Sequence, residues 1–98
     1  KLADMATELQ AARLMLYDAA RAFDDNDPER TKRSAMAKRF VTDAGFNVAN
    51  EALQIHGGYG YLQDYEVERM VRDLRVHQIL EGTNEIMRVI IARHLLNA

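Results

Sequence analysis

Two segments of the chain carry residue types that chemistry would need. The first is Leu-Glu-Gly-Thr-Asn-Glu at residues 80–85, where Glu81 and Gly82 stand directly before Thr83, a residue that can cap a following helix. A carboxylate that faces an apolar cavity has a raised pKa and can act as a general base. Carboxylates near helix N-termini are more often dipole partners or solvated groups, so residue type alone leaves both interpretations of Glu81 open.

The second segment is a glycine-rich break, His-Gly-Gly-Tyr-Gly, at residues 56–60. One glycine is enough to end a helix. Three glycines within four positions also let the backbone approach a ligand closely and leave amide N–H groups free for an anion. A sharp corner between two helices would use the same residues, and both interpretations stay open. The break is not a GxGxxG run after a strand, so a Rossmann dinucleotide site has no support here.

Other combinations of reactive residues are sparse. His56 and His77 have no second histidine at ligand spacing and the chain has no cysteine, so no metal site is predicted. No serine or cysteine nucleophile constellation is present. The formal charge of -2, from 13 basic and 15 acidic residues, argues against nucleic acid or an anionic membrane as the main partner. No apolar run approaches the roughly 18 residues that a membrane span needs.

The apolar spacing predicts that long helices carry both segments. Steps of three and four between apolar residues from Leu2 to Phe23 predict a first helix, which is expected to stop at the polar turn of residues 24–26. Asp27 and Pro28 then supply an N-cap and a first helical residue, so a second helix is expected from Pro28 to about His56.

The remaining elements follow from capping residues and glycines. Gly57 is expected to end the second helix as a left-handed residue. Gly45 inside that helix costs about 1 kcal/mol relative to alanine, so we expect tight packing there. A third, shorter helix is expected from about Asp64 to Asp73, and residues 75–82 are expected to be a connection. Thr83 is expected to cap a final helix.

Three long helices and one short helix, joined by short loops, predict an all-α fold, an antiparallel up-and-down bundle that forms one domain over residues 1–98. The first residue is not Met and lies inside a helical pattern, and no signal peptide is visible. Apolar faces left over on the first and last helices suggest further helices or subunits, so we expect an excised piece of a larger chain or an oligomer. An interaction or oligomerisation module without catalysis is the alternative.

Three runs of residues closely resemble the C-terminal helical domain of acyl-CoA dehydrogenases. They are Ala-Leu-Gln-Ile-His-Gly-Gly-Tyr-Gly-Tyr at 52–61, Val-Arg-Asp at 71–73 and Ile-Leu-Glu-Gly-Thr-Asn-Glu-Ile at 79–86. The resemblance covers essentially the whole chain and is strongest to short- and branched-chain members. It implies that the first helix of the domain, an N-terminal helical domain and a middle β-barrel lie outside this chain. The chain alone is therefore expected to be inactive.

The resemblance implies an FAD enzyme that converts a short or branched acyl-CoA into the 2-enoyl-CoA. Glu81 matches the glutamate that removes the α-proton while the β-hydrogen leaves as hydride to flavin N5, and its backbone N–H matches a donor to the thioester carbonyl. Gly82 matches a residue that lets the thioester pass close to the backbone, and Arg93 a position assigned to substrate contact. Some family members carry the base on an earlier helix and have a small residue at the position of Glu81.

The resemblance also implies cofactor contacts and partners. Two groups of residues match FAD contacts, the first of them to a flavin held mainly by the neighbouring subunit: Gln54, Ile55, His56, Gly57 and Gly58, and then Thr83, Asn84 and Glu85. Electrons are expected to pass to electron-transfer flavoprotein, and the full-length protein is expected to be a homo-oligomer, a dimer of dimers. Bacterial members are cytoplasmic and eukaryotic ones largely mitochondrial. An acyl-CoA oxidase or nitroalkane oxidase-like relative is the alternative within the superfamily.

Overall fold

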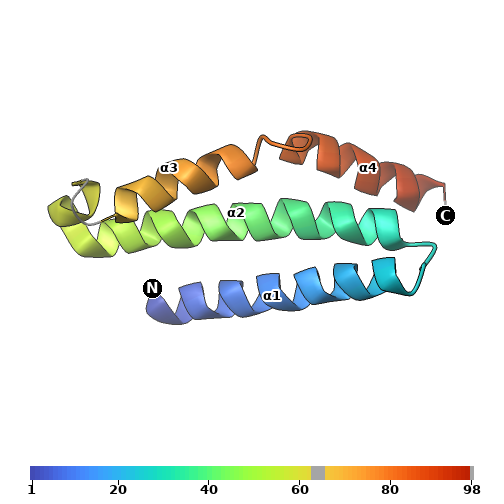
Figure 1. Ribbon diagram of the computed structural model, residues 1–98, viewed down its shortest axis with the longest axis horizontal. Coiled ribbons are helices and arrows are strands. Elements are labelled where there is room, and N and C mark those ends of the chain that lie inside the picture. Colours follow the sequence, from blue (N-terminus) through green and yellow to red (C-terminus); the bar gives the residue numbers. More distant parts are fainter. Residues whose placement is uncertain (63–65, 98) are drawn as a thin grey trace.

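The computed structural model describes residues 1–62 and 66–97 of the chain, and these residues contain helices and no strand. The all-α prediction is therefore confirmed. The elements in chain order are α1 (Leu2–Asp24), α2 (Arg30–His56), the short 3₁₀ helix η1 (Gly57–Tyr61), α3 (Val67–His77) and α4 (Asn84–Leu96) (Figure 1).

Helix α2 is the centre of the molecule. Helix α1 runs antiparallel along one side of it, and α3 and α4 follow one another along the opposite side (Figure 1). In the part of the chain that the structure describes, no Cα atom of α1 lies within 8 Å of one in α3 or α4. The predicted antiparallel order is confirmed. The helices form three layers, with two long helices and two shorter ones instead of three long and one short.

The buried residues of α1 and α2 are all alanines. Alanine at these positions lets two helix backbones approach closely. Ion pairs of 2.7 Å between Arg33 and Asp18 and between Lys1 and Glu51 link the same two helices near opposite ends of the pair. The buried alanines are Ala12, Ala19 and Ala22 of α1 and Ala35, Ala37, Ala44 and Ala49 of α2.

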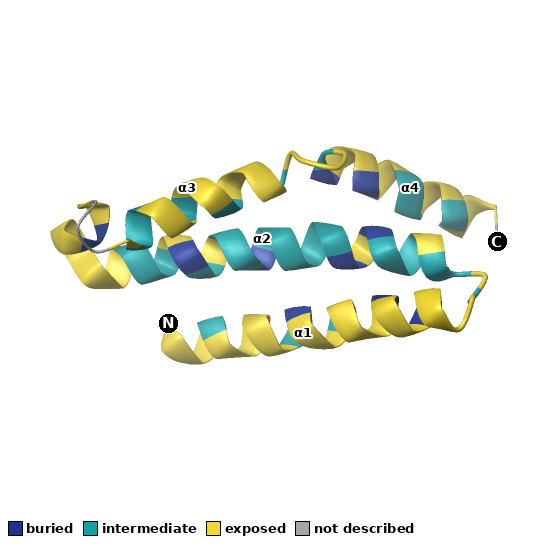
Figure 2. Cartoon of the chain, viewed as in Figure 1, coloured by how far each residue is buried: buried dark blue, intermediate teal, exposed yellow. Residues whose placement is uncertain are grey.

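Large apolar side chains lie mostly outside this core. Among the described residues, no large side chain is fully buried, and the outer faces of α1 and α4 are exposed along most of their length (Figure 2). The predicted leftover apolar faces are confirmed. They include Leu14 and Tyr17 on α1, and Ile86, Leu95 and Leu96 on α4. Leu16 and Phe23 of α1 are also exposed, but they line a groove beside Ala37 and Val41 of α2.

The start of α4 is as predicted, whereas that of α2 differs. The Ile86 N–H donates to Thr83 Oγ1 at 3.2 Å, so Thr83 caps α4. Helix α2 begins at Arg30, two residues later than predicted. The reason is that the Glu29 N–H donates to Asp27 Oδ1 at 2.8 Å and the Arg30 N–H to the Asp27 carbonyl at 3.0 Å. Asp27 therefore caps a turn that precedes the helix.

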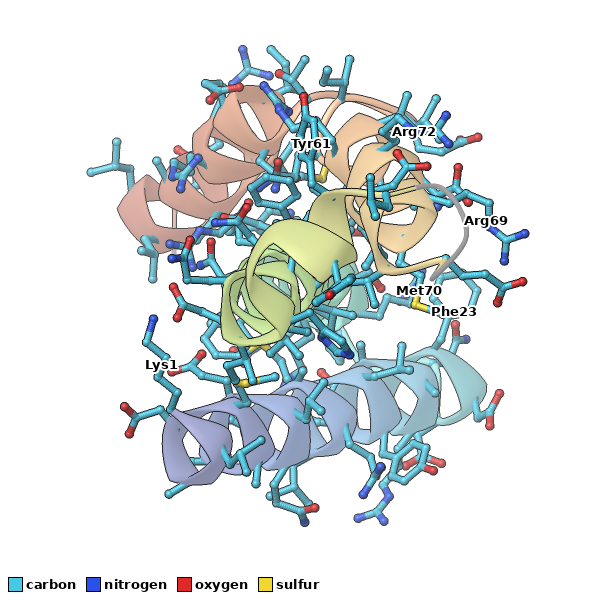
Figure 3. The ribbon with its side chains drawn as sticks, turned by 90° about the vertical axis from the view of Figure 1, so that its left-hand side faces the viewer. Lys1, Phe23, Tyr61, Arg69, Met70 and Arg72 are labelled. Atoms are coloured by element: carbon cyan, nitrogen blue, oxygen red, sulfur yellow. The ribbon has the colours of Figure 1, made fainter. Side chains whose placement is uncertain are left out.

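Helix α3 extends further than predicted. The predicted N-cap Asp64 lies outside the described residues, and the helix continues to His77, so the prediction that residues 75–77 belong to a connection is wrong. Basic Arg75 and His77 in the last turn suit the negative end of the helix dipole. Arg72 donates to both oxygens of Glu68, at 2.7 and 3.1 Å, and this hydrogen bond lowers the pKa of the Glu68 carboxyl. Figure 3 shows Arg72 projecting outward from α3.

Two glycine predictions need correction. Gly57 has a positive φ of 64° as expected, but its ψ of −145° is not that of the left-handed helix, and the chain continues directly into η1. At Gly45 a Cβ atom would meet only Leu74 Cδ2, at 3.8 Å, which is an ordinary van der Waals distance. The prediction of tight packing at Gly45 is therefore wrong as far as the described residues are concerned.

Candidate active site

A tight loop joins α3 to α4 and carries Glu81. The N–H groups of Ile79 and Leu80 both donate to the Val76 carbonyl at 2.9 Å, which extends the end of α3 as a turn. The Asn84 N–H then donates to the Gln78 carbonyl at 3.0 Å and closes the loop. Residues 79–83 are thus held between two backbone anchors.

Glu81 and Gly82 occupy the corner of this loop with positive φ angles of 57° and 88°. Glycine adopts such angles without penalty, whereas a residue with a Cβ atom pays about 1–2 kcal/mol. Residues in such conformations are concentrated at functional sites. The backbone conformation of Glu81 therefore agrees with the hypothesis that this residue has a functional role.

The same corner offers unpaired backbone donors. Within residues 1–62 and 66–97, no acceptor pairs with the N–H groups of Glu81, Gly82 or Thr83. The Glu81 side chain is exposed in this chain, and the N-terminus of α4, with its partial positive charge, begins at Asn84. A carboxylate thus lies beside free N–H donors, the two kinds of group that removal of a proton next to a carbonyl requires.

Asn84 anchors the loop to α2. It is 3% exposed and is the buried polar residue of the described chain. Its Oδ1 accepts a hydrogen bond from Lys38 Nζ at 2.6 Å, and its Nδ2 donates to Asp43 Oδ1 at 2.7 Å and to Thr42 Oγ1 at 2.9 Å. Gln78 Nε2 also donates to Asp43 Oδ1, at 2.8 Å. We call these five residues the Asn84 cluster: Lys38, Thr42, Asp43, Gln78 and Asn84.

The Asn84 cluster also touches the corner directly. Lys38 Nζ donates to the Gly82 carbonyl oxygen at 2.7 Å, one residue beyond Glu81. The sequence did not indicate Lys38, Thr42 or Asp43, although three polar residues within six positions of a helix that packs on both sides could have marked them. Asn84 was predicted as a flavin contact. That prediction stays untested, and the structure gives its side chain a different task inside the protein.

The predicted cofactor residues at the glycine break form an exposed strip at the C-terminal end of α2. A Cβ atom added at Gly57 or Gly58 would meet nothing within 4 Å, so the backbone there is open to an approaching molecule. His56 Nδ1 lies 2.8 Å from the Ala52 carbonyl oxygen; since a carbonyl only accepts, Nδ1 carries the hydrogen. The strip consists of Gln54, Ile55, His56, Gly57 and Gly58.

Gly60 has a different reason to be glycine. A Cβ atom there would lie 2.6 Å from the Leu53 carbonyl oxygen and 2.8 Å from His56 Cβ, closer than such atoms can come. Gly60 therefore lets η1 fold back against the end of α2. The break thus combines both sequence-based interpretations, a corner at Gly60 and open backbone at Gly57 and Gly58.

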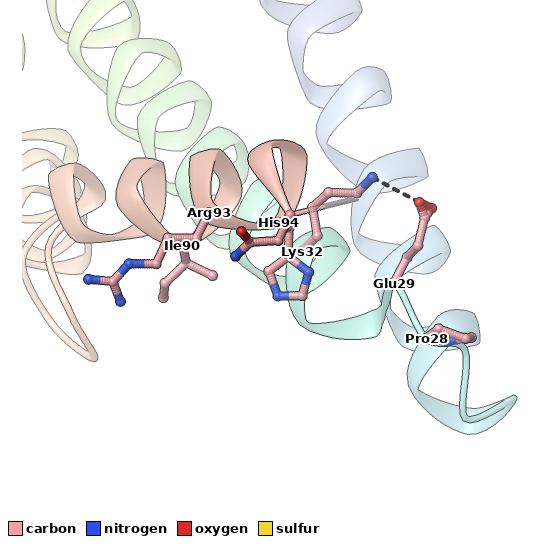
Figure 4. Close-up of a pocket in the computed structure, with 7 residues that line it drawn as sticks. Pro28, Glu29, Lys32, Ile90, Arg93 and His94 are labelled. Atoms are coloured by element: carbon pink, nitrogen blue, oxygen red, sulfur yellow. Dashed lines mark hydrogen bonds and ion pairs between the residues drawn. The ribbon is translucent and has the colours of Figure 1, made fainter.

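The predicted site residues do not converge within this chain. Thr42, which contacts Asn84, and His56 are 14 residues apart in one helix, about 21 Å at 1.5 Å per residue. Arg93 follows Asn84 by nine residues, about 13 Å along α4. It lines a separate cleft of about 480 Å³ at the far end of α4, where Lys32 donates to Glu29 at 2.8 Å (Figure 4). Glu81, Gly82 and Thr83 form one locus, the glycine break a second and Arg93 a third.

No cluster of three or more histidine, aspartate or glutamate side chains that could hold a metal ion occurs in the described part of the chain. None of its helices has the length and apolar character to cross a bilayer.

Proteins that resemble this chain show which family it belongs to. A family model described as acyl-CoA dehydrogenase, C-terminal domain, matches residues 1–96. The chain belongs to the acyl-CoA dehydrogenase family. Bovine mitochondrial isobutyryl-CoA dehydrogenase is 55% identical over 96 residues, which are 98% of this chain.

Solved structures agree with this membership. Butyryl-CoA dehydrogenase from Megasphaera elsdenii matches 97% of the chain with a TM-score of 0.92 and 42% identity. The FAD complex of PigA matches 94% with a TM-score of 0.89 and 32% identity. The chain spans about a quarter of the length of these proteins, 23% of the bovine enzyme and 24% of each of the two solved chains.

Proposed function

We propose that this chain is the C-terminal helical domain of a longer FAD-dependent acyl-CoA dehydrogenase, which oxidises a short or branched acyl-CoA to the 2-enoyl-CoA with Glu81 as the α-proton base. Family membership, the quarter-length match and the uncovered apolar faces of α1 and α4 support the domain assignment. One observation carries the mechanism: Glu81 stands at a strained corner beside unpaired N–H donors, and the Asn84 cluster anchors that corner.

The chain's own residues would do the following. The Glu81 carboxylate takes the α-proton of the thioester, and the electron pair of the broken C–H bond moves toward the carbonyl oxygen. The Glu81 N–H donates to that oxygen and stabilises the developing charge. Gly82 leaves room for the thioester beside the backbone. FAD, when bound, supplies the acceptor for the β-hydrogen as hydride, so that two electrons leave the substrate.

The two predicted cofactor segments fit different parts of an anionic cofactor. The open backbone at Gly57 and Gly58 suits a pyrophosphate, and the N-terminus of α4 at Thr83 suits an anionic or accepting group. Because the segments lie about 20 Å apart along α2, they would serve distant portions of FAD or two copies of it. The second arrangement requires a homo-oligomer, whose interface the exposed faces of α1 and α4 would help to form.

Partners and location follow from the same proposal. Electron-transfer flavoprotein would take the electrons from the reduced cofactor. The matched isobutyryl-CoA dehydrogenase is mitochondrial in cattle. We propose the mitochondrial matrix for a eukaryotic source of this chain and the cytoplasm for a bacterial one, and Arg93 as a substrate contact.

The decisive experiment is Glu81→Gln in the full-length enzyme. The amide keeps the size of the side chain but cannot take a proton, so the purified variant should hold a normal amount of FAD and lose flavin bleaching by acyl-CoA under anaerobic conditions. Glu51→Gln, which alters an exposed ion pair on α2, is the matched control and should bleach at the wild-type rate.

Two results would contradict the proposal. Normal bleaching by Glu81→Gln would remove Glu81 from the reaction. Absence of FAD and of bleaching in the wild-type full-length protein would favour a helical interaction module instead. Exposure of the reduced enzyme to oxygen distinguishes the alternative within the superfamily, because an oxidase reoxidises rapidly and a dehydrogenase does not.

A further inference from the structure

We propose that Lys38, in the middle of α2, is a positioning residue for the Glu81 base. Its ammonium holds the Gly82 carbonyl and thereby fixes the direction in which the Glu81 peptide presents its side chain and its N–H. The inference deepens the proposed function and rests on it. It assigns a role in proton abstraction to a residue 43 positions away from the base in the sequence.

The first step is the geometry of the corner. Glu81 and Gly82 both have positive φ, and neither has an N–H that is paired within the described chain. The 2.7 Å hydrogen bond from Lys38 to the Gly82 carbonyl is therefore the contact that holds the middle of the corner in place. Without it, the corner is tied only at its ends, by the turn at Leu80 and by the Asn84 N–H.

The second step is charge. Lys38 Nζ bonds to Asn84 Oδ1 at 2.6 Å, and the other end of the same amide donates to the Asp43 carboxylate. Reversing the amide would place its N–H₂ against an ammonium and its oxygen against a carboxylate, so the two charges fix its orientation. The Asp43 Oδ2 atom lies 3.7 Å from Arg88 Nη2 and 3.8 Å from Arg39 Nε, which balances the carboxylate further.

The third step is the cost of losing the ammonium. Asn84 is 3% exposed, so an apolar side chain at position 38 would leave its Oδ1 buried without a partner, and the Gly82 carbonyl would lose its donor as well. Buried polar atoms without partners are costly, and the loop would shift to find new ones. A displacement of about 1 Å in a catalytic group can lower a rate about 100-fold. Lys38 thus acts on the reaction through the position of the loop.

The test uses the full-length holoenzyme with Lys38→Met, which keeps an unbranched side chain and removes the charge. Lys1→Met is the matched control, because Lys1 forms an exposed ion pair with Glu51 far from the loop. Anaerobic stopped-flow measurement gives the rate of flavin reduction by an acyl-CoA, with ordinary and with α-deuterated substrate. Bound FAD and thermal unfolding are recorded for each variant.

We expect Lys38→Met to keep its FAD, to reduce the flavin roughly 10- to 100-fold more slowly, and to show a larger α-deuterium isotope effect than the wild type. Lys38→Arg, which restores a cationic donor, should recover much of the rate, and Lys1→Met should match the wild type. A purely structural lysine would lower the unfolding temperature and the FAD content without changing the isotope effect. That outcome, or an unchanged reduction rate, overturns the inference.

Three further outcomes are decided in the same experiment. If Lys38→Met yields no folded holoenzyme, Lys38→Gln is measured instead. Its side chain is neutral and one bond shorter, so it cannot hold the Gly82 carbonyl and Asn84 Oδ1 as the Lys38 ammonium does, and a wild-type rate and isotope effect in that variant also overturn the inference. If Glu81→Gln reduces the flavin normally, the proposed function itself fails. If Glu81→Gln is inactive and Lys38→Met behaves as the wild type, only the role of Lys38 fails.

Discussion

Glu81 occupies a backbone conformation that few residues with a side chain adopt. Its φ of 57° would suit glycine or asparagine better. The other non-glycine residues with positive φ in the described chain are Asn26, in the turn after α1, and Glu66, directly before α3. The carboxylate is therefore not at this corner for the benefit of the backbone. A residue that lowers stability where it stands is more easily explained by a task than by packing.

This conformation leads to a stability prediction. Glu81→Gly should raise the free energy of unfolding of the full-length protein by about 1 kcal/mol, because the Cβ atom that strains the corner is removed. Equilibrium denaturation with urea would measure the change. Glu85→Gly is the control: Glu85 lies in the first turn of α4, where glycine should lower stability by up to about 1 kcal/mol. If Glu81→Gly lowered the free energy of unfolding as much as Glu85→Gly does, the Glu81 backbone would not be strained.

Sequence reasoning found part of this locus and missed the rest for physical reasons. Thr83 was predictable as a cap because a cap is a local property of neighbouring residues. The link from Lys38 to Gly82 spans 44 positions and depends on how α3 and α4 dock on α2, which no local pattern encodes. Asn84 was recognised only by resemblance, and its burial became visible with the fold.

At the scale of elements, α2 connects the predicted functional segments. Its middle anchors the Glu81 corner through the Asn84 cluster, and its C-terminal end carries the open backbone at Gly57 and Gly58. The spacing of apolar residues predicts α1 and α2 as helices, and the structure confirms both. Helix ends are less predictable. Asp27 accepts a hydrogen bond within the turn before α2 and does not cap the helix itself, and α3 continues through Arg75 because no glycine or proline interrupts it.

Gly45 inside α2 and Gly60 in η1 give a matched test of packing. Gly45→Ala should raise the free energy of unfolding by up to about 1 kcal/mol, because alanine favours a helix and the new methyl group would meet Leu74 at an ordinary distance. Gly60→Ala should lower it, since the same methyl group would collide with the Leu53 carbonyl. Thermal denaturation of both variants measures the difference. Destabilisation by Gly45→Ala would show that a part of the protein outside these residues packs against that position.

At the scale of the whole molecule, the chain is a three-layer assembly with an alanine core and uncovered outer faces. Its buried apolar residues are mainly small, and many of the large ones on α1 and α4 are exposed. Burial of apolar surface is the main driving force of folding, so such a distribution leaves much of that force unused until other surfaces cover these faces. The chain spans about a quarter of the length of the relatives that it matches.

The uncovered faces predict the behaviour of the excised chain. Residues 1–98 expressed alone should self-associate and bind the apolar dye ANS, whereas the full-length enzyme should bind far less dye per copy of this domain. Sedimentation velocity and dye fluorescence would measure both properties. A monomeric excised chain without dye binding would mean that the outer faces of α1 and α4 need no cover.

The strained corner at Glu81 also bears on how this family varies. A carboxylate that costs stability is retained only while selection for the reaction outweighs that cost. In a relative whose base lay on another element, selection at this position would be relaxed, and the backbone would then favour the residue with the lowest conformational cost. Glycine should become frequent there, so a relative with glycine in place of the carboxylate at this corner would be expected to carry its base elsewhere in the protein.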